Sequence, residues 1–203
     1  MKRTALGLML AAVCAFAQKP EKPLKNGLYA NFKTEFGDIK AQLFEKDTPQ
    51  SVALFVMLAQ GQQEFRDEDG KIVKRHYYDN TTFFRIMPKV MIQGGSPTGS
   101  ETFNCGLKIR DEMLPGLKFR PGSLAIANTG APDSGGCQFF FTTSTYPSWD
   151  MKYTIFGQAI EGLDVIDKIS SVPVKDEHAI DPPKLISVTF QRVGPMPNVK
   201  KTK

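Results

Sequence analysis

The chain has 203 residues, of which 41% are hydrophobic and 23% are charged, and its formal net charge is +5. About 100 to 200 residues is typical of one domain, and the composition is that of an ordinary soluble globular protein, which excludes disordered, collagen-like and multi-span membrane classes. Only two histidines, His76 and His178, are present. Histidine-rich metal sites and mechanisms that need several imidazole bases are therefore not expected.

The first 17 residues have the pattern of a secretory signal peptide. Lys2 and Arg3 precede an uncharged apolar run, and Ala15-Phe16-Ala17 supplies a cleavage site with small residues at its first and third positions. The run is too short to cross about 30 Å of hydrocarbon as a helix. A buried N-terminal helix and a lipoprotein anchored at Cys14 are the alternatives. We expect cleavage after residue 17, a periplasmic or secreted protein, and no stable membrane insertion afterwards.

Charge and cysteine content argue against two further classes of function, nucleic-acid binding and thiol oxidoreduction. Loss of the leader removes two of the 26 Lys and Arg residues and none of the 21 Asp and Glu residues, which leaves a net charge of +3. No basic stripe alternates with aromatic residues, so nucleic-acid binding is not expected. The mature chain keeps Cys105 and Cys137, for which pairing is allowed in an oxidising compartment. The absence of a C-x-x-C motif disfavours a thiol oxidoreductase.

The first elements in chain order are an extended lead-in, a hairpin and a helix. Residues 18–27 are rich in Pro and Lys and predict the lead-in. Alternation of apolar and polar residues predicts antiparallel strands at 28–34 and 38–44. Thr48 is the expected N-cap of the helix, and Gly61 ends it. Its apolar positions are Val52, Phe55, Val56 and Ala59.

The rest of the chain favours a single β-rich domain. Residues 62–76 are mostly polar and predict an exposed excursion, whereas residues 82–156 contain short apolar runs broken by glycines. Such runs suit the short strands of a sandwich or barrel. A second helix is expected at 162–169 and a closing strand at 184–193. We therefore expect one β-rich domain with two helices, followed by a basic tail at 194–203.

Three polar residues interrupt apolar, strand-like runs. Arg85 lies among Phe, Ile and Met residues, and an arginine in such surroundings needs either a carboxylate or a ligand. A structural ion pair or an outward-facing side chain on a half-buried strand is the simpler explanation. Asn128 and Gln138 are each a lone amide among apolar residues. Turn formation by Asn128 and a sheet-edge hydrogen bond by Gln138 would explain them without a ligand.

Taken together, these segments resemble the cyclophilin family of peptidyl-prolyl cis/trans isomerases. The family patterns are F-H-R-I/V-I-P-x-F-M-x-Q-G-G, A-N-x-G and S-Q-F-F-I, followed by a characteristic ending. The resemblance covers about residues 27 to 193. The segments that match are Phe83 to Gly95, Ala127 to Gly130, Cys137 to Phe141, Tyr153 to Gly157 and Gly162 to Ile166.

The resemblance implies a mainly β fold, a closed eight-stranded antiparallel barrel capped by two α-helices, with a shallow outer groove that takes Xaa-Pro segments. It implies that Arg85 is the catalytic arginine, that Gln93 is its catalytic neighbour, and that no cofactor or metal is required. Asn128 would bind substrate backbone. The full set of expected substrate-binding residues is Phe83, Val90, Met91, Asn128, Gln138, Phe140, Trp149 and Tyr153.

Five positions depart from the family pattern. Val90 stands where the family usually has Phe, which removes a ring from the proline pocket. Phe84 replaces a common His, and Tyr153 also occupies a position where many members have His. Trp149 falls on a Leu position and Ser148 where some members have Trp, so the register of Trp149 in the pocket stays open.

The expected function is therefore catalysis of rotation about Xaa-Pro bonds by an exported, monomeric isomerase of 28–193 that assists protein folding. Its partners would be proline-containing polypeptides. A non-catalytic proline-peptide-binding module or holdase chaperone is the alternative, and a structural barrel with a vestigial groove is a third. Because Cys105 and Cys137 flank the expected groove in a segment that the family folds back on itself, we hypothesise a disulfide between them. Two buried free thiols are the alternative.

Overall fold

The computed structural model of the chain describes residues 23–196. The predicted signal peptide at 1–17, the first residues of the lead-in and the tail from residue 197 onward lie outside the described residues. Within the described part, β-strands predominate and two α-helices are present. The strands are β1 (Gly27–Thr34), β2 (Gly37–Leu43), β3 (Phe65–Arg66), β4 (Ile72–Val73), β5 (Thr81–Thr82), β6 (Arg85–Met87), β7 (Met91–Gly94), β8 (Ser123–Ile126), β9 (Phe139–Thr142), β10 (Ile155–Glu161), β11 (Val174–Lys175), β12 (His178–Ala179) and β13 (Lys184–Val193). The helices are α1 (Pro49–Ala59), the short 3-10 helix η1 (Pro147–Trp149) and α2 (Leu163–Ile169).

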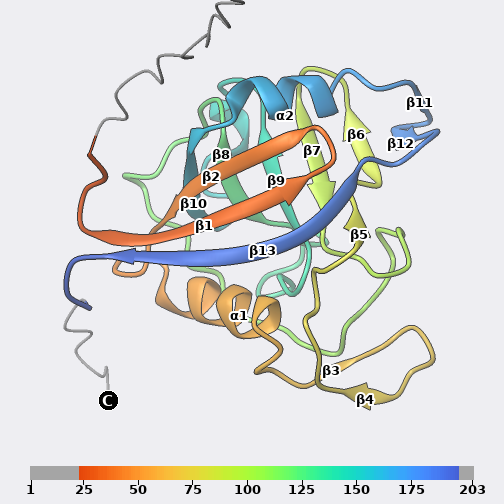
Figure 1. Cartoon of the computed structure of the whole chain (residues 1–203), viewed down its shortest axis with the longest axis horizontal. Coiled ribbons are helices and arrows are strands. Elements are labelled where there is room, and N and C mark those ends of the chain that lie inside the picture. Colours follow the sequence, from red (N-terminus) through yellow and green to blue (C-terminus); the bar gives the residue numbers. More distant parts are fainter. Residues whose placement is uncertain (1–22, 197–203) are drawn as a thin grey trace, which may run out of the picture.

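Eleven of these strands form one antiparallel sheet in the order β11-β12-β6-β7-β9-β8-β10-β2-β1-β13-β5, and β3 and β4 form a separate hairpin within the polar excursion. The predicted hairpin of β1 and β2 is confirmed, with Phe32 opposite Ile39. In Figure 1, α2 lies above and α1 below the strands β1, β2 and β13. Neither helix of the described region is long and apolar enough to cross a membrane.

The expectation of a closed ring of eight paired strands is not confirmed, because the hydrogen-bonded order has two ends. The chain itself explains why. Only Phe83 and Phe84 separate β5 from β6, yet β5 pairs with β13 whereas β6 pairs with β7 and β12. The backbone N–H of Phe83 donates instead to the carbonyl of Pro183. The two ends of the sheet are therefore joined near β5 and β6 by the covalent chain, and not by a further ladder of hydrogen bonds.

Thr48 is the N-cap residue of the first helix, as predicted, but its side chain makes no cap hydrogen bond. Its hydroxyl donates to the carbonyl of Phe44. The carboxylate of Glu112 instead accepts the backbone N–H groups of Gln50 and Ser51, at 3.0 and 2.9 Å. A carboxylate at a helix N-terminus satisfies free N–H groups and suits the helix dipole. This cap comes from a residue 61 positions away from Ser51.

The two faces of the central strands carry different clusters. Phe139 and Phe141 of β9 point into the main core, where Phe32 packs against both rings with centroids 5.5 and 5.0 Å away. Phe140, between them, belongs to a second cluster with Met91 of β7. Because successive side chains of a strand point to opposite faces, β7 and β9 place one set of residues in the core and the next on the outer face.

Candidate active site

A groove with a volume of about 660 Å³ lies over β6, β7 and β9 on this outer face. Eight of the ten residues expected to form the site line it. They are Arg85, Met91, Gln93, Asn128, Gln138, Phe140, Trp149 and Tyr153. Alternation along β7 places Met91 and Gln93 on the same face, and Gln93 lies opposite Phe140 of β9. This register brings the polar and the apolar side chains of the groove together.

The remaining two expected residues do not line the groove. Phe83 is fully buried, and its ring packs edge-on against Phe139 in the core, 6.2 Å between centroids. Its assignment to the substrate site is therefore not supported, because Phe83 lies in the connection between β5 and β6 and its ring is part of the main core. Val90 lies in the turn from β6 to β7, where its N–H donates to the carbonyl of Met87 at 2.9 Å. Its side chain packs against the second cluster, that of Met91 and Phe140.

The apolar end of the groove is a wall of aromatic rings around Phe140. Trp149 and Tyr153 meet this ring edge-on, with centroids 5.8 and 5.2 Å away. Trp149 thus lines the groove, while Ser148 is exposed. Sequence reasoning missed Phe119, which is buried and stacks on Phe140 at 5.9 Å with 13° between planes. This wall offers a rigid apolar surface that suits a ring such as that of proline.

Phe119 is held in place by Asp150. The backbone N–H of Phe119 donates to Asp150 Oδ1 at 3.0 Å, and Lys118 Nζ lies 3.2 Å from the other carboxylate oxygen. Both contacts stabilise the charged carboxylate, the backbone hydrogen bond most of all, and they lower the pKa of Asp150. The segment before β8 is thereby tied to the residue that follows Trp149. No local sequence signal marks Phe119, because it lies in an irregular loop.

The polar end of the groove is a chain of side-chain amides that leads to Arg85. Gln138 Nε2 donates to the backbone carbonyls of residues 100, 101 and 103, at 3.1 to 3.3 Å. Gln138 Oε1 accepts from Gln93 Nε2 at 2.8 Å, and Gln93 Oε1 accepts from Arg85 Nη1 at 3.3 Å. Both glutamines are buried. Buried amides that are satisfied in this way have fixed orientations.

Arg85 also contacts two carboxylates. Glu177 Oε2 accepts from Arg85 Nε and Nη2 at 3.0 and 2.7 Å, and Glu101 Oε2 lies 3.4 Å from Nε. Arg85 therefore forms the ion pairs that the simpler explanation expected. It also lines the groove. Its side chain keeps 31% of its surface exposed, so a ligand can reach it. Sequence reasoning missed both glutamates, which lie in loops without a motif.

Asn128 combines both explanations given for it. Its Oδ1 accepts from the N–H of Gly130 at 3.1 Å, as in a turn, and its Nδ2 donates to the carbonyl of Lys152 at 2.8 Å. The side chain is nevertheless part of the groove lining.

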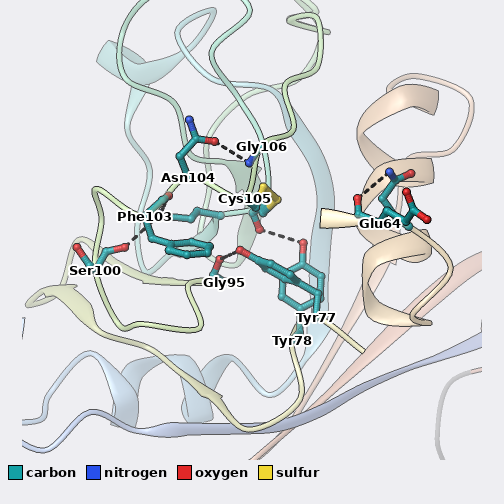
Figure 2. Close-up of a disulfide and its surroundings, with 12 residues drawn as sticks. Glu64, Tyr77, Tyr78, Gly95, Ser100, Phe103, Asn104, Cys105 and Gly106 are labelled. Carbon is teal, nitrogen blue, oxygen red and sulfur yellow. Dashed lines mark hydrogen bonds between the residues drawn. A yellow bond between two sulfur atoms is a disulfide. The ribbon is translucent and has the colours of Figure 1, made fainter. Parts of the chain in front are cut away.

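The hypothesised pairing of the cysteines is confirmed, because Cys105 and Cys137 form a disulfide with Cα atoms 6.5 Å apart. Two buried tyrosines lie beside the disulfide, as Figure 2 shows. Tyr77 donates its hydroxyl to the carbonyl of Gly95, and Tyr78 donates to that of Cys137, both at 3.0 Å. Burial raises the pKa of both phenols well above 10, so they stay protonated donors.

Comparison with known proteins agrees with this geometry. A family model described as cyclophilin type peptidyl-prolyl cis-trans isomerase/CLD matches residues 29–190. Peptidyl-prolyl cis-trans isomerase B of Streptomyces anulatus is 42% identical over 150 residues, which cover 72% of this chain and 85% of that protein. Peptidyl-prolyl cis-trans isomerase A of Mycobacterium tuberculosis is 38% identical over 166 residues, covering 79% of this chain and 91% of that protein.

The fold matches solved structures as well. A cyclophilin type isomerase of Cryptosporidium parvum, solved in the presence of the dipeptide Ala-Pro, superposes with a TM-score of 0.69 at 29% identity, covering 81% of this chain and 99% of that one. A groove with a fixed guanidinium at one end and an aromatic wall at the other suits an amide that precedes a proline ring. On this evidence the chain belongs to the cyclophilin family and is a peptidyl-prolyl cis/trans isomerase.

Proposed function

We propose that Arg85 acts on the rotating Xaa-Pro amide while Met91, Phe140, Trp149 and Tyr153 hold the proline ring. The observation that carries this proposal is that Arg85 and the aromatic wall border one groove. Rotation about the amide meets a barrier of about 18 to 20 kcal/mol because it breaks resonance between nitrogen and carbonyl. No covalent bond has to change, so the task of the protein is to stabilise the twisted state.

In the twisted state the proline nitrogen becomes pyramidal and regains a lone pair. An N–H of Arg85 that donates to this nitrogen stabilises the twisted amide more than the planar one, and only such an interaction raises kcat. A hydrogen bond to a charged group contributes about 1.5 to 3 kcal/mol, which corresponds to roughly 10- to 150-fold in rate. The pocket supplies the rest by fixing the ring on one side of the rotating bond.

The amides have distinct proposed roles. Gln93 accepts from Arg85 and in this way orients it. The donors of Gln138 are directed to backbone carbonyls, and its oxygen accepts from Gln93. We therefore assign Gln138 the role of fixing Gln93, and leave the flanking substrate backbone to the segment at Asn128. We propose that the enzyme acts as a monomer.

The proposed substrates are proline-containing segments of exported proteins, whose folding the enzyme assists in a periplasm or outside the cell. The Ala-Pro dipeptide present with the Cryptosporidium relative supports a proline-containing ligand for the groove. Export is supported by the leader-like pattern of residues 1–17 and by the disulfide, since disulfides persist in oxidising compartments. Mass analysis of protein from the periplasm or the medium, with Gln18 as the expected first residue, tests export.

Exchange between the two isomers of an Xaa-Pro peptide, followed by NMR, tests the division of roles. Phe140→Ala should raise KM about tenfold, because it removes part of the apolar contact with the ring, while the rate at saturation changes less. Thermal unfolding controls for folding. A folded wild-type protein that binds the peptide without accelerating exchange would support the binding-module alternative and contradict the proposal.

A further inference from the structure

Glu177 lies in a two-residue turn that the sheet holds against Arg85. The turn joins β11 to β12, and Lys175 pairs with His178 across it. His178 in turn pairs with Arg85 of β6, and the N–H of Ile86 donates to the carbonyl of Glu177 at 2.7 Å. Figure 1 shows this hairpin at the edge of the molecule beside β6. The backbone therefore fixes the position of Glu177 relative to Arg85.

The conformation of this turn is unfavourable for its sequence. Asp176 and Glu177 have φ angles of 51° and 63°, in the left-handed region. Turns of this kind favour Asn-Gly or Asp-Gly, because a side chain at positive φ is disfavoured at the second position. A glutamate there lowers stability relative to glycine. Strained positions of this type are often retained where the side chain serves the function.

The side chain of Glu177 occupies one edge of the guanidinium. A guanidinium has five N–H donors in a fixed plane. Glu177 Oε2 accepts from Nε and Nη2, and Gln93 Oε1 accepts from Nη1. One N–H on each terminal nitrogen is left, apart from a weak contact of Nη2 with Met87 Sδ at 4.0 Å. Glu101, at 3.4 Å from Nε, is a more distant partner.

We infer that Glu177 is a positioning residue for catalysis, which acts through Arg85 by holding its guanidinium at Nε and Nη2, so that the remaining N–H groups of the two terminal nitrogens can face the rotating amide. This inference rests on the proposed function of Arg85. The arginine side chain is long and flexible, and contacts from Glu177 and Gln93 on separate nitrogens fix both its position and its plane. Orientation before the substrate arrives removes part of the entropic barrier to reaction.

The experiment compares Glu177→Ala with a matched change in the same turn. Glu177→Ala should lower kcat about tenfold, with KM within about twofold of wild type. Glu177→Gln keeps an acceptor oxygen and should recover most of the loss. Asp176→Ala is the control, because it removes one carboxylate from a neighbouring residue with the same sign of φ whose side chain is not a partner of Arg85. It should leave kcat within about twofold.

Two readouts separate positioning from a general structural effect. In an Arg85→Ala background, Glu177→Ala should cause no further loss of rate. The Nε–H signal of Arg85, measured by NMR without any substrate, should exchange with water faster in Glu177→Ala than in wild type or Asp176→Ala. If the wild-type protein lacked isomerase activity, the proposed function would fail while this signal still reported the contact. Unchanged kcat, or an equal loss in the Arg85→Ala background, would overturn the inference.

Discussion

Opening the disulfide is expected to destabilise the protein substantially. Cys105 and Cys137 are 32 positions apart in the chain, and a cross-link over a loop of that length lowers the entropy of the unfolded state. The chain-entropy relation gives about 3.7 kcal/mol at 25 °C for such a loop. For a protein of this size, each kcal/mol corresponds to about 2 to 4 °C in Tm. Reduction should therefore lower Tm by roughly 7 to 15 °C.

The assay is thermal unfolding with and without a phosphine reductant, with thiol counting before and after. A Cys105→Ala/Cys137→Ala variant is the matched control, since its lower Tm should not respond to reductant. Reduction should also loosen the groove lining at Gln138. This residue follows Cys137 in the chain, and its side chain donates to backbone carbonyls just before Cys105. If thiol counting shows complete reduction and Tm is unchanged, the disulfide does not constrain the unfolded chain as argued.

Two further predictions concern the groove wall and the buried phenols. Trp149 is the only tryptophan of the chain and lines the groove, so a saturating Xaa-Pro peptide should shift its fluorescence to shorter wavelength; peptide binding seen by NMR without any such change would contradict its placement. Raised pKa values at Tyr77 and Tyr78 mean that their contribution to stability is complete below pH 10 and declines above it, as the unfolded state loses protons first. The free energy of unfolding should fall by up to about 1.4 kcal/mol per pH unit for each phenol. Urea unfolding between pH 9 and 11 measures this slope, and Tyr78→Phe should reduce it; an identical slope in that variant would refute the assignment.

The features that sequence alone predicted well are those with a short repeat. Period-two alternation identified the β1–β2 hairpin, and the same alternation in β9 explains why Phe140 faces the groove while its two neighbours enter the core. The motif around Arg85 and Gln93 contains two residues that both line the groove, because they lie on adjacent, directly paired strands.

Features that depend on distant segments were missed or wrong. Thr48 occupies the predicted N-cap position of α1, but the carboxylate that accepts from the first turn belongs to Glu112, and a local rule cannot identify a partner 61 residues away. On one continuous strand, Phe83 and Arg85 would point to the same face, because they are two residues apart. Phe83 instead lies in the connection between β5 and β6, and its ring enters the core. The turn at Glu177 lacks the glycine that would have marked a hairpin, so the carboxylate partner of Arg85 had no signal in the sequence.

A single substitution tests the proposed role of Arg85 in catalysis. Arg85→Ala should remove most catalysed exchange of an Xaa-Pro peptide, lowering kcat and kcat/KM together by roughly 10- to 150-fold, because the lost hydrogen bond forms chiefly in the twisted state. Peptide affinity should change much less, since the aromatic wall contacts proline in both isomers. Arg85→Lys should restore little activity, because an ammonium lacks the planar array of donors.

The measurement is two-isomer exchange by NMR on one peptide, with thermal unfolding to show that each variant is folded. The account predicts a folded Arg85→Ala protein that binds the peptide and hardly accelerates its isomerisation. A folded Arg85→Ala protein that exchanged the isomers at the wild-type rate would contradict the account.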